Sequence, residues 1–453
     1  MSYGIIILAA GNGSRMHSKI PKVLHKLAGK TMLEHLIATS LSVAKVKQII
    51  VVAGANISEL QAALPEYPIC WAHQLQQLGT ADAVAAGLKL LDDKIKNVLI
   101  LSGDTPLISK DTLDQLINNT NHNNIGIVTS NIDMPTGYGR IVRDTNNNFI
   151  KIIEELDATN LEKQITEINV GVYLFPKNLL INFLPKINNN NNKQEYYLTD
   201  LLSLAVAQSI IINSQNTLYS LEKNSVNTKE QLIKLERELQ FNQAINLLKQ
   251  GVTILDPKRL DIRGDVTIAK DVEIDVNVIL IGKVIIESGV KIGANCYIKD
   301  SIIGENSIIE PNSVIDGSNI SANVTIGPFA RLRPGTNIGS KSKIGNFVEI
   351  KATSVGESSK INHLSYVGNA KIGNNVNIGA GTITCNYDGV NKYITTIEDS
   401  VMVGSGCQLI APITIGNQAF IAAGTTLIND APANKLTLNK KLQQSREFVK
   451  QEN

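Results

Sequence analysis

The chain has 453 residues, of which 43% are hydrophobic, and this length and composition predict two or three domains with sizeable cores. Its 43 Lys and Arg residues against 41 Asp and Glu leave a net charge of +2, which argues against nucleic acid or a membrane surface as partners. The first apolar run has only the length of a strand, and no later run is long enough to span a membrane. The four cysteines show no CxxC pair or metal-ligand spacing, so we expect free thiols in a cytoplasmic protein.

Residues 1–227 alternate short apolar runs with stretches of helical spacing. This alternation predicts a parallel α/β sheet of the Rossmann-like kind, with ligands bound at the carboxyl ends of its strands. The runs that read as strands buried on both faces are residues 4–10, 47–54, 97–104 and 124–130.

A glycine-rich turn, residues 8–16, follows the first strand, and Lys22 comes shortly after it. The glycines leave backbone N–H groups open to phosphate contacts, and Arg15 and Lys22 would supply cations for a triphosphate. The spacing matches neither the P-loop nor the dinucleotide fingerprint, and alone the turn reads equally as an ordinary strand-to-helix connection. Asp104, after a later strand, reads equally as a helix N-cap or as a metal ligand.

The sequence changes character twice after residue 227. Residues 228–249 contain neither Gly nor Pro and are rich in Leu, Glu, Lys and Gln, so they predict a long helix ended by Gly251. Beyond Gly251 aliphatic residues recur at every sixth position, often followed by Gly. This period predicts a parallel β-helix in which each aliphatic side chain points to the axis and packs on its equivalent about 4.8 Å away.

Polar residues at 379–396 interrupt this repeat, and a loop extruded from a solenoid more often serves a site than the fold. Arg333 and Lys351 are about one coil apart in sequence, so they should stack as a cationic ledge that suits a sugar phosphate. His363, by itself, reads as a solvated surface residue.

Residues 8–16 with Pro21 and Lys22 resemble the LAAGxGxRM…PK signature of sugar-nucleotide pyrophosphorylases. Together with the hexapeptide half, nearly all of the chain resembles the family of bifunctional N-acetylglucosamine-1-phosphate uridyltransferases/glucosamine-1-phosphate acetyltransferases. Further segments that carry the resemblance are residues 77–80, 101–107, 135–140, 167–171 and 195–200.

The resemblance implies a pyrophosphorylase (uridylyltransferase) domain at residues 1–227, a linker helix at 228–250, and a left-handed hexapeptide-repeat acetyltransferase domain with a C-terminal tail at 251–453. It implies acetyl transfer from acetyl-CoA to glucosamine 1-phosphate, then uridylyl transfer from UTP to N-acetylglucosamine 1-phosphate with release of pyrophosphate. The product, UDP-N-acetylglucosamine, would supply cell-wall and lipopolysaccharide synthesis. The family also implies a homotrimer whose partners are small molecules, with neither nucleic acid nor membrane among them.

For the first domain the resemblance assigns Mg²⁺ to Asp104 and Asn227, which offer the oxygen ligands this ion prefers. It assigns N-acetylglucosamine to Gly139, Glu154 and Asn169. The residues implied to bind the uridine nucleotide and its phosphates are Leu8, Ala9, Ala10, Gly11, Arg15, Lys22, Gln74, Gly79, Thr80, Ser102 and Gly103.

For the second domain the resemblance makes His363 the general base that removes a proton from the 2-amino group of glucosamine 1-phosphate. Glu349 is a candidate for orienting its ring, and no metal is expected here. The implied sugar-phosphate residues are Arg333, Lys351, Tyr366, Asn377, Asn386, Tyr387 and Lys392, and the implied acetyl-CoA residues are Ala380, Asn386, Tyr387, Ser405, Ala423 and Lys440.

Several positions depart from the family pattern. Asn12 stands where many relatives carry Lys, Lys440 where they often carry Arg, and Gly406 and Asn369 where acids are common. Two other interpretations stay open. One is a monofunctional nucleotidyltransferase with a regulatory or oligomerising β-helix, as in ADP-glucose pyrophosphorylase-like proteins. The other is an assembly subunit with a degenerate transferase domain, as in some translation-factor complexes. The intact residue sets of the two implied sites argue against both.

Overall fold

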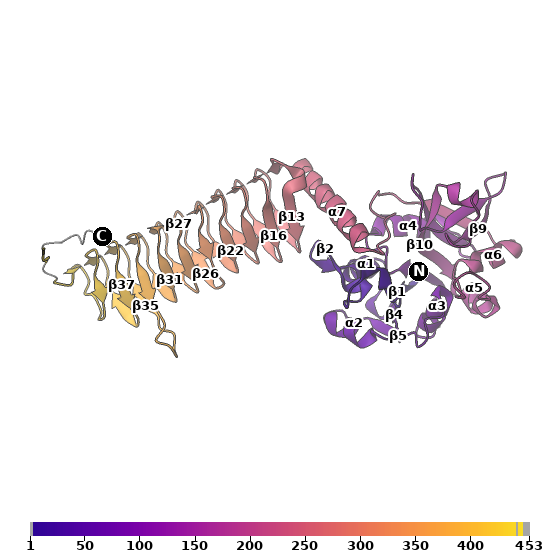
Figure 1. Ribbon diagram of the computed structural model, residues 1–453, viewed down its shortest axis with the longest axis horizontal. Helices are drawn as coiled ribbons and strands as arrows, with labels where there is room; N and C mark the ends of the chain where they lie inside the picture. Colours follow the sequence, from indigo (N-terminus) through magenta and orange to yellow (C-terminus); the bar gives the residue numbers. More distant parts are fainter. Residues whose placement is uncertain (1–2, 441–442, 447–453) are drawn as a thin grey trace, which may run out of the picture. The chain divides into compact units, whose positions relative to one another are not determined.

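The computed structural model describes residues 3–440 and 443–446. The chain divides into two compact units, residues 1–239 (the N-terminal unit) and 240–453 (the C-terminal unit). Figure 1 shows helices around a sheet in the first and a stack of short strands in the second. Among the described residues, no helix has the length and apolar character needed to cross a bilayer.

One sheet forms the centre of the N-terminal unit, with its described strands in the order β11-β7-β10-β6-β1-β4-β5. Neighbours are parallel except at β10, which runs antiparallel to β6 and β7. The strands are β1 (Tyr3–Leu8), β4 (Ile49–Ala53), β5 (Cys70–His73), β6 (Asn97–Ser102), β7 (Ile125–Asn131), β10 (Glu167–Pro176) and β11 (Ile212–Asn216), and a hairpin of β8 (Arg140–Arg143) and β9 (Phe149–Ile153) adjoins them. The four predicted strands are confirmed as β1, β4, β6 and β7.

Strand β10 corrects the expectation of a purely parallel sheet. The chain leaves β7 at its carboxyl end and passes through the β8–β9 hairpin, with no helix that returns it to the other edge. It therefore re-enters the sheet from the edge where β7 ended, and β10 must run backwards.

Helices cover both faces of this sheet. Ile6 of β1 is buried with Val84 of α3 on one face, whereas its neighbour Ile7 is buried with Leu36 of α1 on the other. Because both faces are covered, the central strands are apolar throughout, as predicted. The helices are α1 (Met32–Leu41), α2 (Ile57–Ala63), α3 (Thr80–Leu88), α4 (Lys110–Asn119), α5 (Lys177–Phe183) and α6 (Asp200–Ala207).

A single helix, α7 (Lys229–Lys249), contributes to both units. Leu232 and Leu235 of its first half are buried in a cluster of the N-terminal unit. Gln240 of its second half exchanges two hydrogen bonds of 2.7 Å with the backbone of Ile262 in the C-terminal unit. The first half of the helix therefore belongs to the core of the N-terminal unit, and the second half is hydrogen-bonded within the C-terminal unit.

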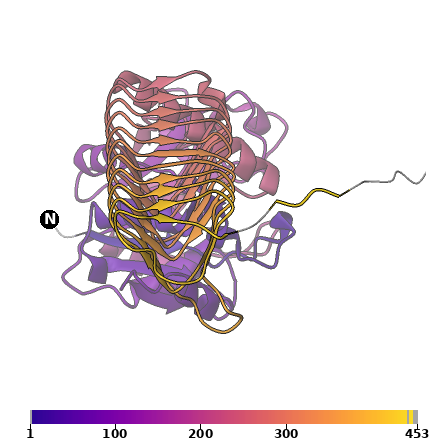
Figure 2. The same cartoon turned by 90° about the vertical axis from the view of Figure 1, so that its left-hand side faces the viewer.

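The C-terminal unit is a parallel β-helix of three sheets. Within the described residues, the sheets have eleven strands from β12 (Thr253–Ile254) to β41 (Leu436–Thr437), ten from β13 (Leu260–Arg263) to β40 (Thr426–Leu427), and nine from β14 (Val266–Ile268) to β38 (Ile413–Ile415). Strands pair in parallel with the equivalent strand of the next coil. Figure 2 shows the coils lying over one another along the axis.

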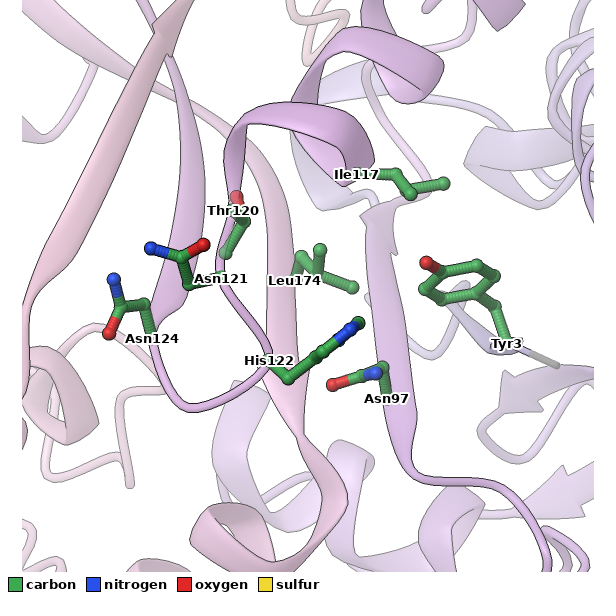
Figure 3. A pocket seen from close by; sticks show the side chains of 8 residues that line it. All are labelled: Tyr3, Asn97, Ile117, Thr120, Asn121, His122, Asn124 and Leu174. Atoms are coloured by element: carbon green, nitrogen blue, oxygen red, sulfur yellow. The ribbon is translucent and has the colours of Figure 1, made fainter. Parts of the chain in front are cut away.

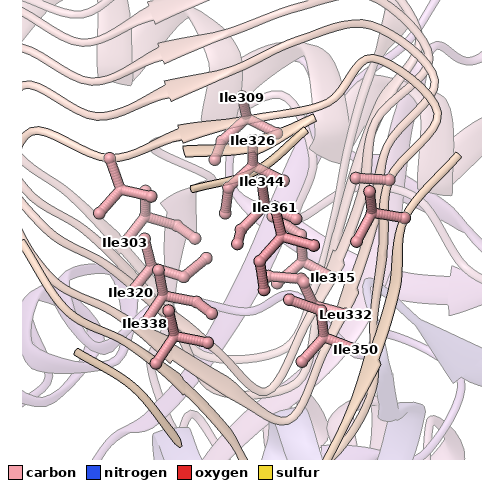
Figure 4. Close-up of a cluster of buried hydrophobic side chains, with 14 of the residues drawn as sticks. Ile303, Ile309, Ile315, Ile320, Ile326, Leu332, Ile338, Ile344, Ile350 and Ile361 are labelled. Atoms are coloured by element: carbon pink, nitrogen blue, oxygen red, sulfur yellow. The ribbon is translucent and has the colours of Figure 1, made fainter. Parts of the chain in front are cut away.

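Each coil places three aliphatic side chains on the axis, one from each sheet (Figure 4). One coil contributes Ile303, Ile309 and Ile315, and the next contributes Ile320, Ile326 and Leu332. All six are at most 1% exposed. Since burial of such a side chain contributes about 1.5–3 kcal/mol, these three columns are the main stabilising feature of the unit, and the predicted six-residue period is confirmed.

Coil length explains the breaks in that period. Equivalent positions are 18 residues apart at some corners and 17 at others, so strands stay in register while the sequence pattern shifts by one. The largest insertion separates Asn377 from Met402, which pair although they are 25 positions apart. The added residues form a loop closed by a bridge between Tyr387 and Lys392, and Figure 2 shows it projecting from the stack.

Candidate active sites

The carboxyl ends of β1 and β6 bring the glycine-rich turn beside residues 102–104. Leu8 lies opposite Ser102 in the sheet, and the Gly103 N–H donates to the Leu8 carbonyl at 2.9 Å. A side chain at Gly103 would collide with that carbonyl oxygen, so the position requires glycine. Residues 8–11 and 102–104 therefore meet at the edge where sheets of this kind bind ligands.

Lys22 joins Asp104 to Asn227. Its Nζ lies 3.0 Å from Oδ2 of Asp104 and 3.1 Å from Oδ1 of Asn227. The Ser102 hydroxyl donates to the other carboxylate oxygen of Asp104 at 2.8 Å. Burial acts to raise the pKa of the Asp104 carboxyl, but Lys22 and Ser102 outweigh it and hold that pKa below its usual range. The carboxylate thus stays charged, and it shares one cation with the amide oxygen of Asn227.

Asp104 does not cap a helix. Helix α4 begins at Lys110, and its N-cap is Ser109, whose side chain accepts a hydrogen bond from the Thr112 N–H. The backbone carbonyl of Asp104 instead accepts a hydrogen bond of 2.8 Å from the N–H of Val226. The helix-cap interpretation is therefore wrong, and this backbone contact holds residues 226–227 beside the carboxylate.

The segment after β5 brings Gln74, Gly79 and Thr80 together. The buried amide of Gln74 donates to the Gly79 carbonyl at 3.0 Å and to the carboxylate of Asp82 at 2.7 Å. The Thr80 hydroxyl accepts a hydrogen bond of 2.9 Å from the N–H of Leu198. These contacts hold the segment at the carboxyl end of β5, on the same edge of the sheet as the glycine-rich turn.

Gln77 fastens this segment to the glycine-rich turn, because its side-chain amide donates to the Ala10 carbonyl. Gly11 and Arg15, further along the turn, are exposed. A side chain added at Gly11 meets no described atom within 4 Å, so the turn is open there. Gln77 was not among the predicted site residues, although residues 77–80 carried part of the resemblance.

Gly139, Glu154 and Asn169 gather at a third position on the same edge. The Asn169 N–H donates to the Gly139 carbonyl at 2.9 Å, and a Cβ on Gly139 would lie 3.5 Å from Oε1 of Glu154. A Cβ on Gly171 would lie 2.9 Å from that of Ser102, so this group adjoins residues 102–104. Burial raises the pKa of the Glu154 carboxyl above its usual range.

Two cavities in the described part of the N-terminal unit lie elsewhere. The smaller is shown in Figure 3, and the larger has a volume of about 820 Å³. Asn97 and His122 line both of them. Asn97 begins β6 and Ser102 ends it, so the strand, roughly 17 Å long, separates these cavities from the predicted residues, none of which lines either one.

Lys392 of the extruded loop lies beside the predicted cationic ledge of Arg333 and Lys351 in the C-terminal unit, and the three side chains are called the ledge from here on. The backbone N–H of Arg333 donates at 2.9 Å to the backbone carbonyl of Ile350. Ile350 precedes Lys351 on β28 (Glu349–Lys351). Lys392 of the extruded loop, and to a smaller extent burial and Arg333, lower the pKa of Lys351. Neighbouring cations disfavour each other's charge, so a bound anion would be stabilised at this ledge.

His363 ends strand β30 (Lys360–His363) and is exposed. Its Nδ1 lies 2.9 Å from Oδ1 of Asn346, the paired residue on the preceding coil. Glu349 was expected to orient this ring, but its Oε1 accepts a hydrogen bond of 2.9 Å from Arg333. That expectation is wrong, because Asn346 pairs with His363 in one sheet, whereas Glu349 lies in another sheet, opposite Tyr366.

Ala380, Ser405 and Ala423 occupy the same corner as His363 in the three following coils. The glycine that follows each of them donates its N–H to a carbonyl one coil earlier. These bonds join Gly381 to His363 at 3.3 Å, Gly406 to Ala380 at 2.8 Å, and Gly424 to Ser405 at 2.8 Å. These predicted acetyl-CoA residues and the predicted base therefore form one column along the β-helix.

A strip of glycines runs beside this column. Gly381, Gly406 and Gly424 have φ of 72°, 72° and 71°, which favour glycine. A Cβ added to Gly381 would lie 3.8 Å from the nearest atom of Gly406, and one added to Gly406 would lie 4.0 Å from Gly424. A Cβ added to Gly424 would have no described atom within 4 Å. The strip is thus open and free of side chains, and Gly406 is part of it.

The extruded loop begins with Asn386, which is 7% exposed and donates from its amide to Oδ1 of Asn369 at 2.7 Å. Asn369, which stands where acids are common in the family, therefore anchors the extruded loop through this hydrogen bond. Tyr387 is exposed. Asn377 lies one coil beyond β30, where its amide donates to Sδ of Met402 at 3.3 Å.

Tyr366 and Lys440 complete the predicted set. Tyr366 begins β31 (Tyr366–Gly368) and lies opposite Glu349, beside the ledge. Lys440 is exposed and follows Asn439, whose Oδ1 accepts a hydrogen bond of 2.6 Å from the Thr426 N–H. No hydrogen bond among the described residues links Lys440 to the ledge or to His363.

Metal-binding groups are few in the part of the chain that the structure describes. No three His, Cys, Asp or Glu side chains gather there as a metal site. Asp104 with Asn227 offers one carboxylate and one amide oxygen, which suits a hard ion that keeps several waters. The four cysteines are free thiols, as predicted.

Comparison with known proteins places both halves in described families. The MobA-like NTP transferase domain matches residues 5–156, the GMPPB C-terminal domain matches 262–337, and the hexapeptide repeat of succinyl-transferase matches 394–428. The bifunctional protein GlmU of Marinobacter nauticus is 45% identical over 434 residues, 96% of this chain and 95% of that protein. The proteins of that name from Janthinobacterium sp. and Acinetobacter baumannii are 47% and 45% identical, covering 96% and 98% of both chains.

A nucleotidyltransferase domain joined to a left-handed β-helix of hexapeptide repeats makes this chain a bifunctional transferase, which acts on a nucleotide and an acyl-CoA. The chain belongs to the family of bifunctional GlmU proteins. This membership confirms the predicted synthesis of UDP-N-acetylglucosamine in two steps, by a nucleotidyltransferase and an acyltransferase. It favours that function over both the monofunctional enzyme and the assembly subunit.

Proposed function

We propose that each unit houses one half-reaction, with uridylyl transfer at the sheet edge of the N-terminal unit and acetyl transfer at the His363 corner of the β-helix. The observation that carries this assignment is that the predicted residues form two clusters, one on each compact unit. Residues 1–227 are then the uridylyltransferase domain, 228–250 the linker and 251–453 the acetyltransferase domain. Separate assays of pyrophosphate and CoA release by the purified chain test it, and both activities must be present.

Uridylyl transfer requires charge neutralisation at the phosphates. A phosphate oxygen of N-acetylglucosamine 1-phosphate attacks the α-phosphorus of UTP, a new P–O bond forms, and the bond to the β-phosphate breaks to release pyrophosphate. Asp104 and Asn227 would hold Mg²⁺, which neutralises phosphate charge when bound. The support is that their two oxygens approach the same ammonium group within 3.1 Å. Lys22 and Arg15 would add positive charge.

The remaining predicted residues of this unit fit a nucleotide with a sugar beside it. Residues 8–11, 74, 79–80 and 102–103 come from the carboxyl ends of neighbouring strands and would surround the uridine nucleotide. Gly139, Glu154 and Asn169 adjoin residues 102–104 and would hold N-acetylglucosamine.

Acetyl transfer requires a base and a site for the sugar phosphate. Nε2 of His363 takes a proton from the 2-amino group, the nitrogen forms a bond to the acetyl carbonyl carbon, and the C–S bond breaks. The departing CoA sulfur takes up the proton from the imidazolium. The ledge of Arg333, Lys351 and Lys392 would bind the phosphate. Residues that would contact the sugar are Tyr366, Asn377, Asn386 and Tyr387.

The column above His363 and its glycine strip fit acetyl-CoA. Ala380, Ser405 and Ala423 lead to His363 in three coil steps, and the strip beside them leaves room for an extended chain. Asn386 and Tyr387 would contact acetyl-CoA at the loop. Lys440 would pair with a CoA phosphate, as a single charge instead of the two-pronged contact of Arg.

Filling the strip should weaken acetyl-CoA binding. In Gly406→Leu the side chain would project into the open strip, and we expect KM for acetyl-CoA to rise about tenfold, the equivalent of about 1.4 kcal/mol. Gly251→Leu is the matched control, since Gly251 also has a positive φ, of 94°, and lies outside the strip. Both variants should lose similar stability in thermal melts. An unchanged KM for acetyl-CoA in Gly406→Leu would show that acetyl-CoA does not bind along the strip.

The chain is proposed to act as a homotrimer in the cytoplasm, where its thiols stay reduced. Hexapeptide repeats themselves suggest oligomerisation. An exposed apolar ridge supports it, since Phe329 and Phe347 stack with ring centroids 5.3 Å apart and Leu364 follows on the next coil, all at least 50% exposed. Exposed apolar patches of this kind mark association surfaces.

Fragments of the chain separate the folding of the N-terminal unit from the proposed trimer assembly of the C-terminal unit. A fragment of residues 1–239 should be a folded monomer by light scattering, and one of residues 228–453 should be a trimer. A fragment of residues 1–227 should melt at lower temperature than 1–239, because it lacks Leu232 and Leu235, each worth roughly 1.5–3 kcal/mol when buried. A monomeric 228–453 fragment contradicts the trimer.

A further inference from the structure

We propose that Asn346 is a positioning residue for His363. Its side-chain oxygen holds the imidazole in the tautomer that carries the proton on Nδ1, so that Nε2 is presented as the base. This inference rests on the proposed role of His363 in acetyl transfer, and Asn346 was not among the predicted site residues.

The backbone places the two side chains together. Strand β27 (Lys343–Asn346) pairs in parallel with β30, and Asn346 is the partner of His363 at the end of that ladder. The Leu364 N–H donates to the Asn346 carbonyl at 3.1 Å, which holds the two backbones at this corner. Equivalent positions on paired strands are about 4.8 Å apart, and their side chains leave the β-helix on the same face.

The hydrogen bond defines which ring nitrogen is the base. Oδ1 of Asn346 lies 2.9 Å from Nδ1 of His363. An amide oxygen can only accept a hydrogen bond, so Nδ1 must donate, and a neutral imidazole has only one N–H. The lone pair of the ring is therefore on Nε2, on the opposite side from Asn346. If the amide were flipped, its NH₂ would donate to Nδ1 and the ring proton would lie on Nε2. Nε2 could then not accept a proton as a base.

An amide orients the ring without adding charge to a corner that must bind an anion. Lys343 and Lys360 are the charged residues of the two paired strands. Across the corner, Glu349 is engaged by Arg333, and Lys351 faces the loop lysine of the ledge. A carboxylate in place of Asn346 would orient the ring too, but it would favour the imidazolium and oppose the sugar phosphate.

Two substitutions separate orientation from packing in the full-length chain. Asn346→Leu keeps the branched shape and removes the acceptor, whereas Asn346→Asp keeps the acceptor and adds a charge. The matched control is Asn337→Leu, because Asn337 is an exposed asparagine on another outward face, in β26 (Thr336–Ile338). For each, kcat and KM of acetyl transfer are measured across pH, together with uridylyl transfer.

In Asn346→Leu we expect kcat of acetyl transfer to fall about 10–100-fold, the usual effect of losing a group that orients a functional histidine, with KM for glucosamine 1-phosphate changed less than about twofold. In Asn346→Asp we expect most of the rate to persist at high pH, with the acid limb of the pH profile moved up by about one pH unit. Asn337→Leu and the uridylyl transfer of every variant should match the wild type.

The outcomes distinguish this inference from the role of His363 itself. If His363→Ala loses acetyl transfer while Asn346→Leu keeps its kcat and Asn346→Asp keeps the wild-type acid limb, the positioning role is overturned alone. If His363→Ala retains acetyl transfer, the proposed base is overturned. If Asn346→Leu does not fold, Asn346→Asp decides, since a carboxylate in contact with Nδ1 must move the acid limb up, whereas one that does not contact the ring would leave the limb in place.

Discussion

Replacing His363 with alanine is expected to lower the rate of acetyl transfer on the order of 10²–10⁴-fold, the usual contribution of a positioned general base. The side chain is exposed at the end of β30, where the column of predicted acetyl-CoA residues begins and a hydrogen bond to Asn346 holds the ring. CoA release with saturating glucosamine 1-phosphate measures the effect. The acid limb of the wild-type pH profile should also be absent from the variant.

Uridylyl transfer from supplied N-acetylglucosamine 1-phosphate is the internal control for His363→Ala, because the site proposed for it draws on residues of the N-terminal unit. Lys360→Ala, at an exposed position of the same strand, should keep acetyl transfer near the wild-type rate. A His363→Ala variant with most of its acetyl transfer intact would make this histidine an ordinary surface residue.

Replacing Asp104 with alanine is expected to reduce uridylyl transfer on the order of 10²–10³-fold, as for removal of one preorganised charge-stabilising group. The carboxylate is the only charged member of the proposed Mg²⁺ pair, and its loss leaves Lys22 with Asn227 alone among its described partners. Pyrophosphate release measured over a range of Mg²⁺ concentrations should show a higher requirement for the ion in the variant.

Asp114→Ala is the matched control, since Asp114 is a half-exposed residue of α4 in the same unit and forms a surface ion pair with Lys110. Acetyl transfer by Asp104→Ala should match the wild type. If uridylyl transfer and its Mg²⁺ dependence are both unchanged in Asp104→Ala, this carboxylate does not bind the ion.

The β-helix could be predicted from the sequence because its core repeats. Each coil needs three aliphatic side chains at fixed positions, so Ile303, Ile309 and Ile315 report the fold in the chain itself. The parallel part of the N-terminal sheet was predictable for a related reason, since strands buried on both faces are apolar throughout. The antiparallel β10 was not, because its direction depends on the β8–β9 hairpin and leaves no mark on its own composition.

The partner of His363 could not be predicted from the sequence. Asn346 ends β27 and Glu349 begins β28 in another sheet, so only three positions separate them on either side of one corner, and the position of that corner decides which one pairs with His363. The position of a corner carries no periodic signal in the sequence. The cationic ledge was predictable, because Arg333 and Lys351 are one full coil apart and directly follow Leu332 and Ile350, which pair on adjacent coils.

The central claim, that the two half-reactions occupy separate sites on separate units, is tested most directly by assaying both reactions on His363→Ala and Asp104→Ala in parallel preparations. Release of CoA reports acetyl transfer, and release of pyrophosphate reports uridylyl transfer. We expect a crossed pattern, in which each variant loses one activity and keeps the other at the wild-type rate. Equal loss of both activities in either variant, while it remains folded, would contradict the account.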